Sequence, residues 1–366
     1  MTYLMVTGGL VLLLFGGDVL VKGAVTLAQR LSIPPLVIGL TVVAFGTSSP
    51  ELVVSLDAVI SGAPEIAIGN VVGSNIANIL LVLGLSAVIV PIACVEISKR
   101  HDVAIMFAVT LGFIALCWSG QLLIWQGAVM ILLLCGYLAW SYYSGQNDDE
   151  GIEVISSGSD SILPWFYRWL NKIGLERGTA THLLLSLGFI VAGIAGLVVG
   201  AHLLIEGSIE IAVAAGVSKA TIGLSLIALG TSLPELATSI VAAIRRHGDV
   251  AIGNVVGSNL FNILGIMGIT SMVRTLPIPE QIVNYDLWVM LVAVILVTPF
   301  VYRGKPIGRL FGAFLTTTYL IYVLSLYHGM SGMPKSNTSQ AMQLTTTKHN
   351  ARILLANRQF VASIDH

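Results

Sequence analysis

Charged side chains are scarce in this sequence. Asp, Glu, Lys and Arg make up 10% of its 366 residues, whereas a typical soluble domain carries about 25%. Hydrophobic residues make up 55%, and they form repeated runs of about 20 residues, the length that crosses a bilayer as a helix. The composition excludes a soluble globular domain and predicts an integral membrane protein. The formal net charge of -1, without a basic patch, gives no indication of a nucleic-acid partner.

Cysteine is also rare. The three cysteines, Cys94, Cys117 and Cys135, all lie in or beside apolar runs. Their odd number excludes a disulfide framework, and their spacing is not that of a zinc site. The sequence has neither an HExxH motif nor a Ser/His/Asp spacing. A membrane enzyme is therefore the weakest interpretation, and no cofactor is expected.

Ten apolar segments predict ten transmembrane helices. They lie near residues 3–29, 36–61, 66–92, 103–119, 122–143, 183–206, 219–244, 249–273, 285–302 and 307–328. One long polar stretch divides them into two sets of five. We therefore expect a first membrane repeat at 1–143, a cytoplasmic linker at 144–181, a second membrane repeat at 182–328 and a polar tail at 329–366.

One stretch of the chain occurs twice without a gap. Residues 46–84 and 230–268 align at a constant offset of 184 positions, and the nine residues 67–75 recur unchanged as 251–259. Because five helices is an odd number, the second copy enters the membrane in the opposite direction. The predicted fold class is an all-α integral membrane protein of ten transmembrane helices, built as two inverted-topology five-helix repeats. Many secondary transporters follow this plan, with their sites near the bilayer midplane.

The distribution of Lys and Arg predicts the orientation. If the N-terminus is outside, the cytoplasmic loops hold eleven basic residues, whereas the opposite loops hold Lys219 and Arg274. The positive-inside rule therefore favours an N-out, C-out protein. The expected location is the cell inner (plasma) membrane, crossed many times.

The repeated stretch places a carboxylate in the middle of an apolar span. Glu51 and Glu235 occupy equivalent positions, and a proline precedes each. Ionisable residues inside a span mark a functional site by default. Because proline obstructs the helical hydrogen bond to the carbonyl about four residues back, we expect free carbonyls around 44–46 and 228–230.

Hydroxyl and amide side chains surround each carboxylate in the sequence. They are Thr47, Ser48, Ser74 and Asn78 in the first copy, and Thr231, Ser232, Ser258 and Asn262 in the second. An all-oxygen set suits hard cations, and Ca²⁺ takes about 6–8 oxygens in flexible geometry. Two carboxylates compensate one divalent ion, so Na⁺ or protons must replace Ca²⁺ for the return step. The alternative interpretation is a permanently protonated pair that holds helices together, and the glycines of these motifs are also common packing residues.

At these residues the chain resembles the calcium/cation antiporter superfamily, specifically the sodium/calcium exchanger family and its bacterial inner-membrane members. The motifs GTSSPE with GNVVGSNIAN, and GTSLPE with GNVVGSNLFN, occur in the expected order and spacing. The resemblance implies alternating access, in which the first helix of each repeat slides over the other eight. It also implies Ca²⁺ ligands and Na⁺ ligands at matching motif positions. For Ca²⁺ these are Glu51 and Glu235 with Thr47 and Thr231; for Na⁺ they are the Ala44 and Ala228 carbonyls, Ser48, Ser232, Ser74 and Ser258, with Asn78 and Asn262 completing the centre.

Two details of the motifs refine this expectation. Some exchangers, including potassium-dependent ones, have Asp where Asn262 stands, which makes potassium co-transport less expected here. The proton-coupled branch has an acidic residue shortly after the GN of its second motif helix, and GNVVGSN offers none. We therefore expect a secondary active antiporter that exchanges Ca²⁺ for Na⁺, with these ions and the lipid membrane as its partners. An H⁺-coupled or broader divalent-cation exchanger is the alternative, and an ion channel is a third interpretation.

The first span carries charges of its own. Asp18 and Lys22 are four residues apart, which predicts an ion pair within one helix. Lys22 also aligns with Glu206 at the repeat offset, so a pair between the two peripheral helices is the alternative. His202 is expected to be a polar residue at a helix end.

Overall fold

The computed structural model describes residues 2–31, 33, 35–93, 98–147, 179–214 and 228–331. Most of the predicted linker and tail, and the first part of the predicted span 219–244, lie outside these ranges. The chain forms two compact units, residues 1–319 and 320–366. The arrangement and the site described below belong to the first unit.

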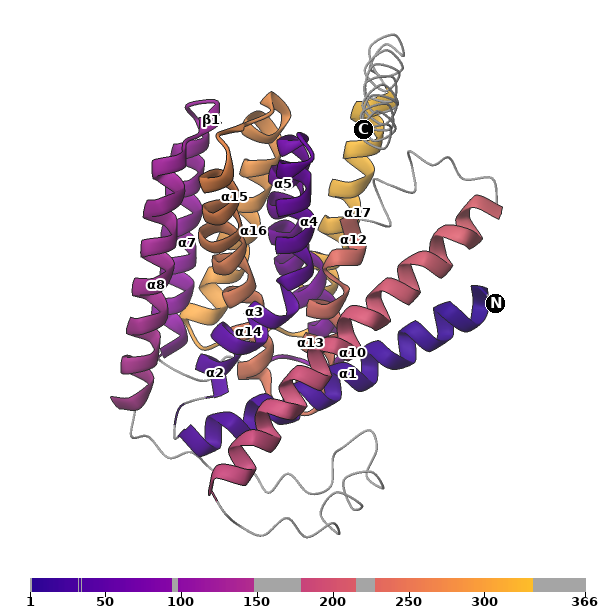
Figure 1. Ribbon diagram of the computed structural model, residues 1–366, viewed down its shortest axis with the longest axis vertical. Helices are drawn as coiled ribbons and strands as arrows, with labels where there is room; N and C mark the ends of the chain where they lie inside the picture. Colours follow the sequence, from indigo (N-terminus) through magenta and orange to yellow (C-terminus); the bar gives the residue numbers. More distant parts are fainter. Residues whose placement is uncertain are drawn as a thin grey trace, which may run out of the picture. The chain divides into compact units, whose positions relative to one another are not determined.

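Most of the described residues are helical (Figure 1). In the first half the elements are α1 (Thr2–Leu31), α2 (Pro35–Ile38), the π-helical η1 (Gly39–Val43), α3 (Ala44–Thr47), α4 (Ser49–Ile60), α5 (Pro64–Ala77), the π-helical η2 (Asn78–Leu83), α6 (Gly84–Ile89), α7 (Ser98–Cys117), β1 (Gln121–Leu122) and α8 (Ile124–Asn147). In the second half they are α10 (Thr179–Ala214), α12 (Ala228–Thr231), α13 (Leu233–Ile244), α14 (Gly248–Leu260), the π-helical η4 (Phe261–Ile266), α15 (Met267–Val273), β2 (Leu276–Pro277), the π-helical η5 (Ile282–Asp286), α16 (Leu287–Tyr302) and α17 (Arg309–Ser331).

The helices match the predicted spans closely. Within the described ranges, seven helices are long and apolar enough to cross a membrane, and the bent segment from α2 to α4 raises this number to eight. Two shorter apolar helices, His101–Cys117 and Leu233–Ile244, coincide with two further predicted spans. The boundary of the sixth span was wrong, because α10 continues to Ala214 rather than ending near 206. Glu206 and Ser208 end the apolar run there without ending the helix.

A bend in each half follows from proline. The helix axis turns by 45° between the segment that ends at Thr47 and α4. Ser48, which joins them, has φ -84° and ψ 7°, and its equivalent Ser232 has φ -86° and ψ 5°. A proline stands near the start of the helix that follows in each case, where its missing N–H is tolerated. The same local sequence thus produces the same break twice.

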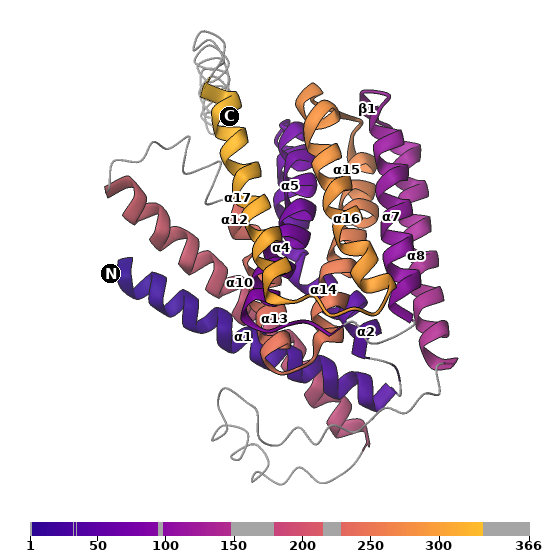
Figure 2. The same cartoon turned by 180° about the vertical axis from the view of Figure 1, so that it is seen from behind.

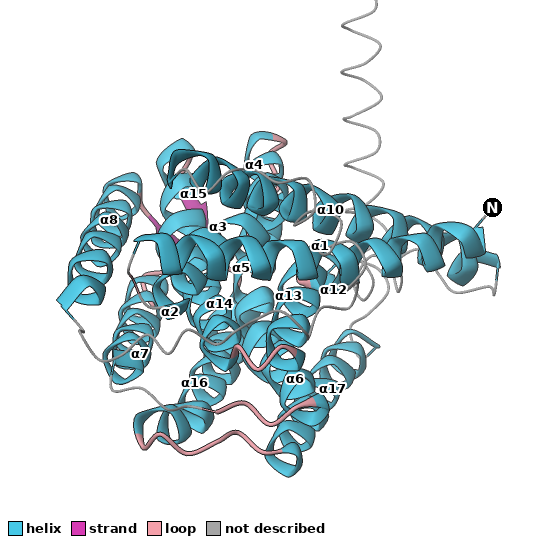
Figure 3. Ribbon diagram, turned by 90° about the horizontal axis from the view of Figure 1, so that it is seen from below, coloured by secondary structure: helices cyan, strands magenta, loops and turns pink. Residues whose placement is uncertain are grey.

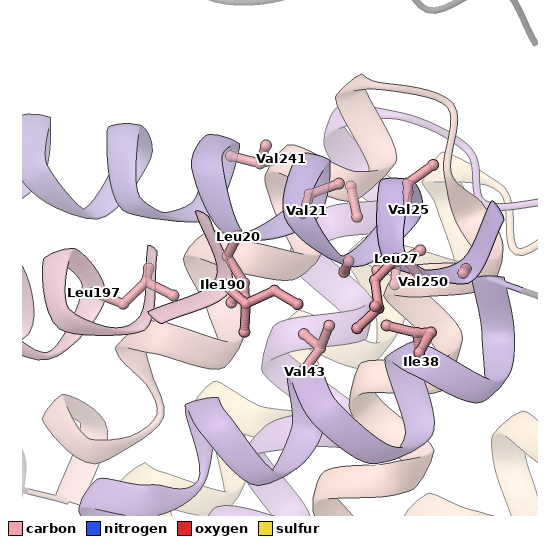
Figure 4. Close-up of a cluster of buried hydrophobic side chains, with 14 of the residues drawn as sticks. Leu20, Val21, Val25, Leu27, Ile38, Val43, Ile190, Leu197, Val241 and Val250 are labelled. Atoms are coloured by element: carbon pink, nitrogen blue, oxygen red, sulfur yellow. The ribbon is translucent and has the colours of Figure 1, made fainter. Parts of the chain in front are cut away.

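The helices α1 and α10 run side by side, at an oblique angle to the other long helices (Figures 1 and 2). Glycines allow the close approach: a Cβ on Gly193 would lie 2.6 Å from the Leu20 nitrogen, and one on Gly9 would lie 2.7 Å from the Gly200 oxygen. Small residues drive such packing between membrane helices. Figure 4 shows part of one buried apolar cluster, which includes Leu20 of α1, Ile190 and Leu197 of α10, and Val241 and Val250.

The remaining helices of the first unit form a bundle around α5 and α14, as the view from below shows (Figure 3). The span that contains α14 is the most enclosed of the candidate spans. Its most apolar stretch is buried throughout, whereas only a third of the corresponding stretch of α10 is buried. A short antiparallel pair of strands, β1 and β2, connects the two halves at one end, with Leu122 opposite Leu276. The stretches with the repeated polar motifs therefore lie at the centre of the bundle.

Candidate cation site

The two carboxylates occupy equivalent places in the fold. Glu51 lies in the first turn of α4 and Glu235 in the first turn of α13, where a helix N-terminus favours negative charge. Both residues are 0% exposed, and the two carboxyl groups lie close enough to interact electrostatically. Ser48 donates its hydroxyl hydrogen to Glu235 Oε1 over 2.8 Å, so the break in one half touches the carboxylate of the other. The two halves of the chain meet at this point.

Many of the oxygens gathered here have no hydrogen-bond partner among the described residues. These atoms are both carboxylate oxygens of Glu51, Oε2 of Glu235, the hydroxyls of Ser74, Ser232 and Ser258, and the amide oxygens of Asn78 and Asn262. In the interior of a membrane protein an unsatisfied polar group costs several kcal/mol. A hard cation bound among these oxygens would supply a partner for those that reach it. Their chemistry therefore fits a hard cation as the transported substrate.

The polar residues of the neighbouring spans stand where the helix changes its winding. Ser74 lies on α5 and Asn78 begins η2, while Ser258 lies on α14 and Asn262 lies in η4. Single π-helical turns inside α-helices often occur at functional sites, because the extra residue per turn redirects side chains. Both copies of the motif adopt this winding, and the two segments differ by one residue at the repeat offset.

Two asparagines that the sequence did not single out support the carboxylate helices. Asn70 Nδ2 donates to the Glu51 backbone oxygen at 3.2 Å and to Ser55 Oγ at 3.0 Å. Asn254 Nδ2 makes the equivalent bonds, to the Glu235 backbone oxygen at 3.4 Å and to Ser239 Oγ at 3.1 Å. Both asparagines stand in the nine-residue identical stretch, so the offset of 184 was the signal that could have identified them.

The two threonines of the motif are held by these same asparagines. Thr47 Oγ1 donates to Asn254 Oδ1 at 3.1 Å, and Thr231 Oγ1 lies 3.5 Å from Asn70 Oδ1. Each threonine thus contacts the asparagine of the opposite half. Because both threonines also lie close to a carboxylate, Thr231 to that of Glu51 and Thr47 to that of Glu235, they link the asparagines to the two acidic side chains.

The expectation of free carbonyls at the first break was wrong for two residues. The Ala44 carbonyl accepts the Ser48 N–H at 3.0 Å, and the Thr47 hydroxyl oxygen lies 3.3 Å from it. The Gly46 carbonyl accepts the Ser49 hydroxyl at 2.7 Å. The Ser49 side chain replaces the donor that the following proline lacks. In the second half, Ala228 begins α12.

Two further buried hydroxyls lack a partner within the described ranges, and sequence reasoning did not find them. Thr238 lies on α13, one turn after Glu235, and Ser86 lies on α6, which packs against α13. The positions equivalent to them by the repeat offset are Val54 and Thr270. The hydroxyl of Ser86 therefore has a counterpart in the second half, Thr270, whereas that of Thr238 has none, because Val54 is apolar.

The described residues bring two carboxylates together here, those of Glu51 and Glu235. In the part of the chain that the structure describes, no three His, Cys, Asp or Glu side chains gather into a cluster that could hold a metal. The other oxygens of the site come from neutral hydroxyls and amides. A ligand set of this kind suits hard cations rather than soft transition metals.

The charges of the peripheral helices pair differently from expectation. Asp18, which is 1% exposed, accepts hydrogen bonds from two nitrogens of the Arg245 guanidinium, at the end of α13. The prediction of a purely local Asp18–Lys22 pair missed this long-range partner. His202 lies within α10 rather than at a helix end, and its Nε2 is 3.1 Å from Glu206 Oε1. Glu206 therefore has a partner on its own helix.

This chain is similar to known proteins in both sequence and fold. The model of the family described as "Sodium/calcium exchanger protein" matches residues 1–143 and 185–328. The sodium/calcium exchanger MaX1 of Methanosarcina acetivorans is 31% identical over 89% of this chain and 98% of its own. The inner membrane protein YrbG of Escherichia coli is 32% identical over 87% of this chain and 94% of its own. A solved structure of the sodium-calcium exchanger NCX_Mj superposes with a TM-score of 0.74, at 32% identity over 89% of this chain and 98% of that one.

The fold and the site define a multi-pass membrane transporter that exchanges cations, and not an enzyme. The chain belongs to the sodium/calcium exchanger family. The resemblance read from the two repeated motifs is thereby confirmed. Transported ions are the substrates of such a protein, and the comparisons indicate no cofactor.

Proposed function

We propose that this protein is a secondary active antiporter that exchanges Ca²⁺ for Na⁺ across the inner membrane, by alternating access to one central site. The proposed ligands are the Glu51 and Glu235 carboxylates with hydroxyl, amide and backbone oxygens around them. These are Thr47, Thr231, Ser48, Ser232, Ser74, Ser258, Asn78 and Asn262, with the carbonyl of Ala228; the Ala44 carbonyl is not among them, because it already accepts the Ser48 N–H.

One observation carries the proposal. Two fully buried carboxylates lie together, and three of their four oxygens have no hydrogen-bond partner in the described part of the chain. Two negative charges balance one divalent cation, so a filled site is electrically neutral and compatible with a low-dielectric interior. Once Ca²⁺ leaves, the two carboxylates repel each other. Na⁺ ions bound by the same oxygens remove this repulsion, which couples the return step to Na⁺ binding.

The proposed architecture is the ten-helix inverted repeat, with repeats at 1–143 and 182–328, a cytoplasmic linker at 144–181 and a polar tail at 329–366. The paired contacts support it, since Asn70 and Asn254 make equivalent bonds to equivalent partners. A site shared by two inverted halves has two equivalent exits, one on each side of the membrane. We propose the N-out, C-out orientation for the same protein, from the positive-inside rule.

Calcium uptake into proteoliposomes tests the proposal. With Na⁺ inside, uptake should require an outward Na⁺ gradient, and it should fall to background in Glu51→Gln and Glu235→Gln. The matched control is Glu65→Gln, which changes an exposed carboxylate on α5 in the same way. A wild-type protein that moves Ca²⁺ under a pH gradient without Na⁺ is an H⁺-coupled exchanger. A sustained Ca²⁺ current without any counter-ion indicates a channel, and an absence of Ca²⁺ movement in every condition means that the cargo is a different cation.

A further inference from the structure

Two central asparagines present their amide oxygens and not their amide nitrogens as unpaired atoms. Asn78 Nδ2 donates to Asn259 Oδ1 at 3.2 Å, and Asn262 Nδ2 donates to Asn75 Oδ1 at 3.1 Å. The Oδ1 atoms of Asn78 and Asn262 have no hydrogen-bond partner among the described residues. All four side chains are at most 1% exposed, so bulk water does not orient them. Their orientation must come from neighbouring side chains.

The next contact outward is to a methionine in each half. Asn259 Nδ2 donates to Met106 Sδ, and Asn75 Nδ2 donates to Met290 Sδ, each at 3.8 Å. Met106 lies on α7 and Met290 on α16, and both are 1% exposed. The same offset of 184 positions that relates Glu51 to Glu235 also relates these methionines. They lie far outside the repeated polar motifs.

A thioether fixes the direction of this chain of bonds. An asparagine amide fits a pocket in either of two orientations that exchange its oxygen and nitrogen, whereas a methionine sulfur accepts and never donates. The sulfur of Met106 therefore favours the orientation in which the Asn259 nitrogen faces it. The Asn259 oxygen then faces Asn78 and takes its amide hydrogen. Only the Asn78 oxygen remains, and an oxygen is the end of the amide that binds a cation.

Sulfur also suits this position because it does not compete for the substrate. A carboxylate or carbonyl oxygen in the same place would accept the same hydrogen bond, but it would also attract a hard cation. A thioether is a soft ligand with little affinity for Na⁺ or Ca²⁺. The methionine supplies an acceptor without adding a second cation-binding place behind the first.

We propose that Met106 and Met290 are positioning residues, which act through Asn259 and Asn75 to aim the amide oxygens of Asn78 and Asn262 at the transported cation. This inference rests on the proposed function. It assigns to α7 and α16 a part in cation affinity, although neither helix carries a proposed ligand.

The test compares Met106→Leu and Met290→Leu with Met130→Leu in proteoliposomes. Leucine keeps the volume and removes the acceptor, and such exchanges are well tolerated in cores. Met130 is a matched control because it is a buried methionine on α8, which carries no proposed ligand. We expect the KM for Ca²⁺ to rise roughly two- to fivefold in each test variant, the range for one weak to ordinary hydrogen bond. The maximal exchange rate and the melting temperature should match those of Met130→Leu.

A double-substitution cycle separates positioning from packing. In an Asn259→Ala background no amide remains for Met106 to orient, so adding Met106→Leu should change the KM by less than about twofold. Independent, multiplying effects of the two substitutions overturn the inference. So does an unchanged KM with a lowered maximal rate or melting temperature. If the wild-type protein itself shows no Na⁺-driven Ca²⁺ uptake, the proposed function fails; if it does and the leucine variants equal the control, only the inference fails.

Discussion

At the centre of the bundle the two copies of the repeat make the same contacts, whereas in the pair α1 and α10 the two copies carry different charged residues. At the centre, Asn70 and Asn254 make equivalent bonds, and so do Asn78 and Asn262. In the peripheral pair the charged positions differ: α1 has Asp18 and Lys22 where α10 has His202 and Glu206. In the proposed function, the two halves supply the same kinds of oxygen to one cation. Helices that pack mainly through small residues have no such requirement, so their charges differ.

The carboxylates should provide the sharpest test of equivalence at the centre. We expect Glu51→Gln and Glu235→Gln to lower Ca²⁺ transport at least ~100-fold each, because either change leaves a divalent ion with one compensating charge in a buried site, a loss of about 3–5 kcal/mol. Equilibrium Ca²⁺ binding to the purified variants, measured by calorimetry, checks this apart from transport. A variant that loses transport but keeps wild-type Ca²⁺ affinity would show that the two carboxylates are not equivalent ligands.

The next largest effect is expected in the peripheral region. Arg245→Met leaves the Asp18 carboxylate buried without its guanidinium partner, and we expect the free energy of unfolding to fall by about 3–5 kcal/mol. Thermal melting in detergent measures this change. The double variant Asp18→Leu with Arg245→Met removes both charges and should recover most of the loss. If the double variant is no more stable than Arg245→Met, then the unpaired carboxylate is not the cause.

The sequence predicted the spans and the central polar residues because two independent signals coincide there. Apolar runs define the helices, and exact repetition marks the residues that do more than fill them. Glu51 and Glu235 lie together, as the inverted plan required. The role of these residues as cation ligands stays a prediction, as do the linker and the tail.

What the sequence could not predict depends on partners far along the chain. Asp18 has a plausible partner four residues away, but Arg245, 227 residues distant, provides the bonds. The Gly46 carbonyl was expected to be free because proline removes a donor, yet the Ser49 hydroxyl takes that place. Local sequence rules identify polar groups that need a hydrogen-bond partner. Which residue provides that partner depends on the tertiary fold.

The supporting asparagines should give a smaller and symmetrical effect. Asn70→Ala and Asn254→Ala each remove the buried hydrogen bonds to a threonine and a serine hydroxyl and to a backbone carbonyl, and we expect each to lower the free energy of unfolding by about 1–3 kcal/mol. Melting in detergent should give the same loss for both within ~0.5 kcal/mol, which is the spread for equivalent sites. Unequal losses would show that the two halves differ in stability even where their contacts match.

The smallest effect is expected at the one charged pair described within α10. The side chains of His202 and Glu206 are 70% and 49% exposed, and such pairs contribute about 0–1 kcal/mol or nothing measurable. Glu206→Gln should therefore leave the melting temperature and the rate of exchange close to wild type, in contrast to Arg245→Met. Each variant removes one charged partner of a residue on the helix pair, Asp18 of α1 or His202 of α10, and the two pairs differ strongly in burial. A loss in Glu206→Gln as large as that in Arg245→Met would mean that α10 needs its charges as much as α1 does, and the contrast between centre and periphery would then have another cause.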